Sequence, residues 1–137
     1  YTRALTREFA AGCEVSLVGS AHLASYAETG LNGKPVGATA IKDEIAGCFA
    51  EADGRRTDTV VLACTHYPLL LERFKTNAPW PVDWLDPAPA IARRVADLMR
   101  DRPAVAPPAA PKIVFTSGRA PSPALAAALR GYGFSAE

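Results

Sequence analysis

A cysteine and a histidine stand two residues apart, directly after an apolar run that spans Val60 to Ala63. The run is apolar without alternation, which is typical of a strand buried on both faces of a parallel sheet. In open α/β sheets the ligand crevice lies beyond the carboxyl ends of the strands. Cys64, Thr65 and His66 therefore occupy a position at which such folds carry their chemistry. A thiol there can act as a nucleophile, a metal ligand or a proton-transfer group.

The neighbours of Cys64 favour a reactive thiol. A cysteine with an ordinary pKa of about 8.5 is shifted toward thiolate by a nearby cation or by a helix N-terminus. The helix predicted from Leu69 begins close enough to contribute, and His66 could act on the Cys64 proton. Taken alone, however, a strand-end cysteine is more often a small buried hydrophobic residue, and His66 alone could be structural.

The other candidate ligands show no comparable pattern. Cys13 lies beside a predicted strand and Cys48 on the core face of a predicted helix, so both are interpreted as structural. Three cysteines without CxxC spacing favour reduced thiols over a disulfide framework. A second Cys/His pair that could complete a zinc site is missing, and the glycines match neither a phosphate loop nor a dinucleotide fingerprint. No metal and no cofactor are expected.

Helix-like and strand-like segments alternate along the chain, which predicts an α/β fold with a parallel sheet flanked by helices in three layers. Strands are predicted over 14–18, 59–63, 82–85 and 112–116. Helices are predicted over 2–11, from a Ser20 cap to Glu28, near 39–52, and over 69–76, 87–100 and 123–131. The Pro/Ala-rich stretch 101–111 is typical of a stiff, extended connector.

Composition excludes several classes of partner. The chain carries 15 basic and 14 acidic residues in 137, and these are dispersed, which argues against a nucleic-acid face or a polybasic membrane anchor. No apolar run approaches the roughly 18 residues that a membrane span needs, and no secretory signal is recognisable. We expect a soluble, cytoplasmic protein that binds a small molecule rather than nucleic acid or membrane.

The run from Cys64 to Pro68, Cys-Thr-His-Tyr-Pro, resembles the second catalytic-cysteine motif of glutamate racemases. The similarity continues through Leu69 to Leu71 and extends over nearly the whole chain. Further matching segments follow in family order: Tyr1-Thr2-Arg3, residues 15–20, Tyr26-Ala27-Glu28, Trp84-Leu85-Asp86 and residues 90–94.

This resemblance implies cofactor-independent racemisation, in which two thiols flank the α-carbon of glutamate and the D-isomer serves peptidoglycan synthesis. It implies an acid–base role for Cys64 on one face, in abstraction from L-glutamate. His66 and Glu28 would support that face, and Thr65 would contact the substrate. The family's first catalytic cysteine and its Asp partner belong to a preceding half that is not in this sequence. The chain is therefore expected to be a fragment that is inactive alone.

The resemblance also implies a domain organisation. Residues 1–86 would form most of the second lobe of a two-lobe racemase fold and carry the Cys-Thr-His motif. Residues 87–137 would return to the first lobe, with an apolar face left exposed or mispacked in the isolated chain.

Alternative functions remain open from the sequence. The chain could be a truncated, non-catalytic domain that binds a ligand or a partner, or it could be an aspartate or hydantoin racemase of the same superfamily. Cys64 and His66 could also form a hydrolase pair, which would leave a covalent acyl-enzyme. A homodimer is an open alternative for the full-length form.

Overall fold

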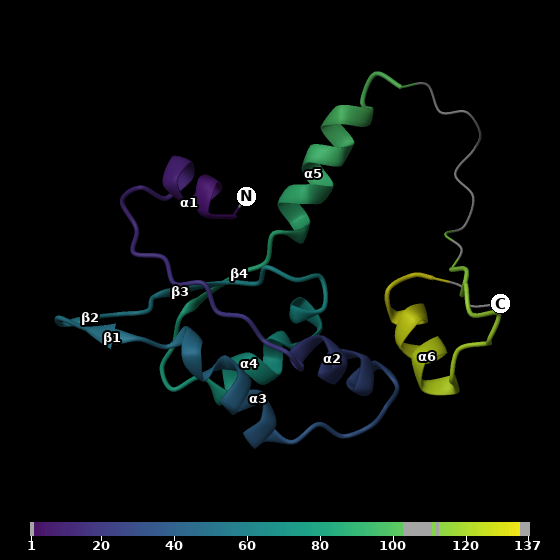
Figure 1. The fold of residues 1–137 in the computed structure, drawn as a ribbon. Coiled ribbons are helices and arrows are strands. Elements are labelled where there is room, and N and C mark those ends of the chain that lie inside the picture. Colours follow the sequence, from purple (N-terminus) through teal and green to yellow (C-terminus); the bar gives the residue numbers. More distant parts are fainter. Residues whose placement is uncertain (1, 103–110, 112, 135–137) are drawn as a thin grey trace.

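The computed structural model describes residues 2–102, 111 and 113–134 (Figure 1). Helices and short strands alternate in it, so the α/β class expected from the sequence is confirmed. In chain order the elements are α1 (Thr2–Phe9), α2 (Leu23–Leu31), α3 (Ala38–Ile45), the 3-10 turn η1 (Ala46–Cys48), β1 (Glu51–Ala52), β2 (Arg55–Arg56), β3 (Thr59–Val61), the 3-10 turn η2 (Tyr67–Leu70), α4 (Leu71–Asn77), β4 (Asp83–Leu85), α5 (Ala88–Met99) and α6 (Pro123–Gly131).

A small parallel sheet, formed by β3 and β4, positions the motif. Val61 stands opposite Leu85 in the register, and the Leu62 N–H extends the ladder by donating to the Leu85 carbonyl at 2.9 Å. The segment between the two strands contains η2 and α4, as expected for a crossover between parallel strands. Two of the predicted strands therefore form, at positions close to those expected.

One face of this sheet is not covered by the described part of the chain. Val61 and Leu85 are each 54% exposed, whereas Trp84, which precedes Leu85 on β4 and so points to the opposite face, is half-buried and stacks on Phe74. The expectation that the 59–63 strand is buried on both faces was thus wrong. The reason is that α2, α3 and α4 gather on the Trp84 side, where the core lies.

The core lies between these three helices and the sheet. Helix α2 contributes Leu23 and Ala27, and α3 contributes Ile41 and Ile45, in each case four residues apart and so on one helical face. The buried set is Leu23, Ala27, Ile41, Ile45, Leu62, Leu70 and Phe74.

A short hairpin replaces the end of a predicted helix. The helix expected near 39–52 ends at Ile45 and continues only as η1, after which β1 and β2 pair antiparallel. Asp53 and Gly54 connect the strands with φ of 52° and 72°. An Asp-Gly pair readily adopts this left-handed turn, so the hairpin signal was present in the sequence and was missed.

Two predicted strands do not form. Residues 14–18 run as an irregular segment, and so do residues 113–115, with a turn following at Thr116. A strand needs a neighbour to pair its N–H and C=O groups, and no described segment forms a ladder with either stretch. Lys112, where the last strand was expected to begin, and 103–110 of the proposed connector lie outside the described residues.

Helices α1 and α5 bury no residue in the core. Helix α5 projects away from the group formed by α2, α3 and α4 (Figure 1), and none of its residues is buried. Helix α1 likewise buries none. Helix α6 does contact α2, and the Ser122 hydroxyl at its start donates to the Asn32 side chain at 2.9 Å.

Candidate active site

Cys64 lies at the surface in a short turn that follows β3. Leu62 is buried and Ala63 is exposed, after which Cys64, Thr65 and His66 reverse the chain direction into η2. The Tyr67 N–H closes the turn by donating to the Cys64 carbonyl at 3.0 Å. The cysteine therefore lies at the carboxyl end of a parallel strand, as the sequence predicted.

Three of the four predicted site residues come together at this turn. His66 lies between two partners: its Nδ1 is 3.9 Å from the Cys64 Sγ, and its Nε2 is 3.0 Å from the Glu28 Oε1. Glu28 belongs to α2, 38 residues earlier in the chain. An ionised carboxylate can only accept, so the Nε2 carries the proton and Nδ1 is left to exchange a proton with the thiol.

The pKa values of the pair shift in opposite directions. The backbone N–H of His66 stabilises the thiolate and lowers the pKa of Cys64, and although burial opposes this, the His66 side chain and the Tyr67 N–H add to the lowering. Hydrogen bonds to Cys64 and then to Glu28 raise the pKa of His66. Both shifts favour a thiolate beside an imidazolium, which is the reactive form of such a pair.

Thr65 is exposed at the same turn, next to both members of the pair. The remaining cysteines lie elsewhere: Cys13 is exposed, and Cys48 is half-buried at the end of η1. Burial raises the pKa of the Cys48 thiol, which makes it less reactive. Cys64 is thus the thiol with the lowered pKa.

Tyr67 was interpreted from sequence as a loop-shaping residue. It packs edge-on against Phe74, with 6.4 Å between ring centroids. Burial raises the pKa of Tyr67, as do the nearby Cys64, Cys48 and Glu44, while a hydrogen bond with Ser20 acts in the opposite direction.

Sequence reasoning missed Glu44 and gave Ser20 only a capping role. Ser20 does serve the start of α2, because the Leu23 N–H donates to its hydroxyl at 3.0 Å. That hydroxyl also donates to the Glu44 carboxylate. An acidic residue beside Ile41 and Ile45, on the border of an apolar stripe, was the signal that could have identified Glu44.

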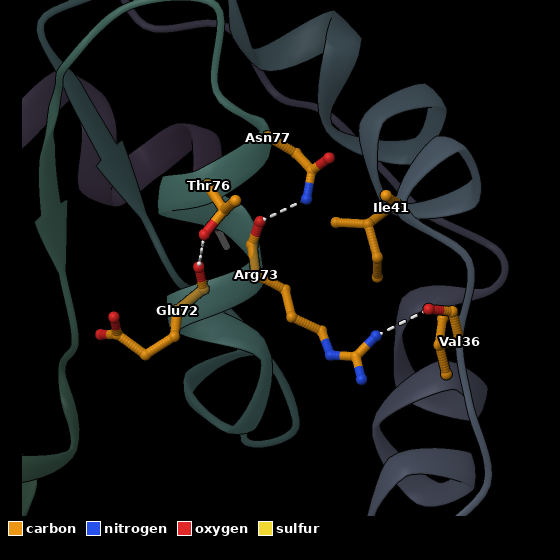
Figure 2. A pocket seen from close by; sticks show the side chains of 7 residues that line it. Val36, Ile41, Glu72, Arg73, Thr76 and Asn77 are labelled. Carbon is orange, nitrogen blue, oxygen red and sulfur yellow. Dashed lines mark hydrogen bonds between the residues drawn. The ribbon is translucent and has the colours of Figure 1, made fainter.

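Two hollows of the described surface lie away from Cys64. One of about 280 Å³ lies between α3 and α4 (Figure 2), where Arg73 donates to the Val36 carbonyl at 2.8 Å and Thr76 to the Glu72 carbonyl at 2.8 Å. These polar groups are used within the fold rather than converging on a ligand. A second hollow of about 790 Å³ lies between α1 and residues 15–17. We therefore take the thiol–imidazole–carboxylate row, which lines neither hollow, as the candidate site.

The described residues also limit what else the chain can bind or span. Across residues 2–102, 111 and 113–134, no group of three or more His, Cys, Asp or Glu side chains could hold a metal ion. In that same portion of the chain, no helix combines the length and the apolar character needed to cross a membrane.

Comparison with known proteins identifies the relatives of this chain. No protein-family model matches it. The glutamate racemase of Agrobacterium fabrum is 50% identical over 136 residues, an alignment that covers 98% of this chain and 50% of that protein. The glutamate racemase of Mesorhizobium japonicum is 48% identical, with 98% and 52% covered. The chain is homologous to glutamate racemases.

A solved racemase structure agrees with this relationship. The crystal structure of Escherichia coli glutamate racemase in complex with L-glutamate and the activator UDP-MurNAc-Ala superposes with a TM-score of 0.80 at 35% identity. The match covers 98% of this chain and 50% of that racemase. The resemblance to glutamate racemase and the α/β fold class are thus both confirmed. The chain spans about half the length of the racemases it matches.

Proposed function

We propose that this chain supplies one half of a glutamate racemase active site, with Cys64 as the acid–base group on one face of the substrate. The observation that carries the proposal is the row of thiol, imidazole and carboxylate at the end of β3, in a chain 50% identical to a racemase. A thiol whose pKa is lowered toward the working pH is suited to both removing and returning a proton.

In the proposed reaction the Cys64 thiolate removes the α-proton of L-glutamate. The C–H bond breaks, an S–H bond forms, and the electron pair is left on the α-carbon, where the substrate carboxylate delocalises it. A proton delivered to the opposite face then gives D-glutamate. His66, held by Glu28, stabilises the thiolate before the transfer, and Thr65 contacts the charged groups of the substrate.

Racemisation needs acid–base groups on both faces of one carbon, and Cys64 can serve only one. We propose that a counterpart of the relatives' remaining half supplies the opposite group. In this arrangement residues 1–86 belong to the second lobe, and 87–137 return to the first. The exposure of Ile91, Val95 and Leu98 along α5 supports this division, because such a face is normally covered.

We further propose that the reaction takes place in the cytoplasm and supplies D-glutamate for peptidoglycan synthesis and hence for cell shape. The protein would act on free glutamate, without nucleic acid or membrane as partner and without a cofactor. The full-length form would be a homodimer. The support for this setting is the homology with bacterial glutamate racemases.

Deuterium exchange at the α-carbon tests the proposal. D- and L-glutamate are incubated in heavy water with the 137-residue chain, with the remaining half of the Agrobacterium fabrum racemase, and with both together. We expect exchange only when both are present, and its loss in Cys64→Ala but not in the matched Cys48→Ala variant. Full turnover by this chain alone would contradict the requirement for a second half, and no exchange by the combined halves would contradict the racemase proposal.

Acyl transfer is the second candidate, because the same row of Cys64, His66 and Glu28 also suits a thiol nucleophile. The two functions leave different products on the protein. Incubation with an activated ester followed by mass spectrometry would reveal an acyl group on Cys64 that turns over if the chain is a hydrolase. A racemase forms no covalent intermediate with glutamate.

A further inference from the structure

The contact between Glu28 and His66 depends on where α2 lies. Glu28 is 56% exposed and reaches His66 from a different element, so nothing in the local sequence of the motif holds it there. It follows Ala27, which is buried in the core, and α2 packs against η2. A small displacement or rotation of α2 would therefore move the carboxylate away from the imidazole.

A serine before α2 ties the start of that helix to α3. The Ser20 hydroxyl accepts from the N–H groups of Leu23 at 3.0 Å and His22 at 3.3 Å, and it donates to the Glu44 carboxylate. A hydroxyl has one hydrogen to donate, and its oxygen accepts from these N–H groups. Because both N–H groups can only donate, the hydroxyl hydrogen must go to Glu44.

Glu44 is itself held in place by the core. Its side chain is 18% exposed and lies on α3 between Ile41 and Ile45, both of which are buried. The other carboxylate oxygen is 4.0 Å from the His22 Nε2. The carboxylate is therefore a fixed acceptor, and through Ser20 it sets the start of α2 relative to α3.

We propose that Ser20 and Glu44 are positioning residues for the candidate site: their hydrogen bond fixes α2 and so keeps Glu28 on His66. The proposal deepens the proposed function, and its catalytic consequence rests on that function. Its structural consequence, however, can be measured without substrate, through the ionisation of Cys64.

The groups around the thiol determine in which direction the pKa of Cys64 should shift when the Ser20–Glu44 hydrogen bond is lost. His66 and Tyr67 face Cys64 from its own turn, Glu28 faces it from α2 through His66, and Glu44 and Cys48 act on Tyr67. Loss of the Glu28 contact leaves His66 less often protonated and so raises the pKa of the thiol. Removing the negative charge of Glu44 without any loss of position would lower it. The two roles therefore predict shifts in opposite directions.

The test is the pH dependence of Cys64 alkylation in the 137-residue chain, with each cysteine peptide followed by mass spectrometry. For Ser20→Ala and Glu44→Ala we expect the pH of half-maximal labelling to rise by about half a unit, which corresponds to roughly threefold less thiolate below that pH. Glu44→Gln keeps an oxygen that accepts from Ser20 and loses only the charge, so its midpoint should stay at or fall below the wild-type value, and a rise like that of Glu44→Ala would contradict the positioning role. Thr57→Val, which removes hydroxyl bonds to Ala50 beside the β1–β2 hairpin, is the matched control and should not shift.

A double variant separates positioning from general loosening of the fold. Ser20→Ala should add little to the shift of Glu28→Gln, because both remove the same contact. Unchanged midpoints in Ser20→Ala and Glu44→Ala, downward shifts in Glu44→Ala, additive shifts in the double variant, or a wild-type midpoint equal to that in urea would each overturn the proposal. Because the labelling needs neither glutamate nor a second protein half, failure of the racemase function would leave this result intact.

Discussion

At the scale of single residues, the pKa values of the Cys64 and Cys48 thiols shift in opposite directions. Backbone N–H groups lower the pKa of the first, and burial raises that of the second. The proximity of Cys64 and His66 could be predicted from sequence, because two residues at a strand end remain neighbours in any turn. The contact with Glu28 could not be derived in this way and rested on family resemblance. The bond between Ser20 and Glu44 depends on how α2 packs on α3, which no local pattern encodes.

We expect the two thiols to respond oppositely to pH. Alkylation of Cys64 should reach half its maximal rate below the ordinary thiol value of about 8.5, and that of Cys48 above it, because thiolate is the reactive form. His66→Ala should raise the Cys64 midpoint and leave that of Cys48 unchanged. Peptide-resolved labelling across pH 5 to about 10 measures both at once. Parallel profiles for the two cysteines would contradict the ionisation described for this site.

At the scale of elements, the prediction of helices succeeded where apolar residues repeat with helical spacing. Helices α2, α5 and α6 form close to the expected ranges, because their own backbone hydrogen bonds suffice locally. Strands depend on a neighbour, so the apolar stretches at 14–18 and 113–116 could not be judged from their own residues. Only the pair that finds a partner, β3 with β4, was predicted correctly.

A matched pair of isoleucines tests which helices stabilise the chain. Ile41 of α3 is fully buried, whereas Ile91 of α5 is 59% exposed. Ile41→Ala should lower the free energy of unfolding by about 3 kcal/mol through lost burial and a residual cavity, and Ile91→Ala by less than about 0.5 kcal/mol. Urea unfolding followed by circular dichroism provides the measurement. Equal losses in the two variants would mean that α5 packs as tightly as α3.

At the scale of the whole molecule, apolar side chains are distributed unevenly. The core gathers under one face of the parallel sheet, while Val61 and Leu85 on the other face and the apolar side of α5 remain open. Exposed apolar side chains gathered along one face of an element are typical of a contact region. This uneven exposure agrees with the finding that the chain spans about half the length of its relatives.

This exposure predicts that the folded chain binds a hydrophobic dye. The triple variant Ile91→Gln, Val95→Gln and Leu98→Gln should reduce the fluorescence of bound anilinonaphthalene sulfonate, because it removes apolar surface from α5. The control Arg93→Gln with Arg94→Gln changes the same helix without removing such surface and should retain the signal. Adding the remaining half of the Agrobacterium fabrum racemase should quench the wild-type signal. A native chain that binds no dye would show that these faces are covered.

Because of the bond between His66 and Glu28, the reactivity of the Cys64 thiol also reports on the progress of folding. The two residues are 38 positions apart, so the part of the thiol's activation that comes through Glu28 arises only after α2 has packed against η2. A brief pulse of alkylating agent at neutral pH, applied at successive times after dilution from urea, would record when this docking occurs. Cys48 labelling in the same samples would date the burial of η1, so two cysteines in one short chain report separately on site assembly and on core formation.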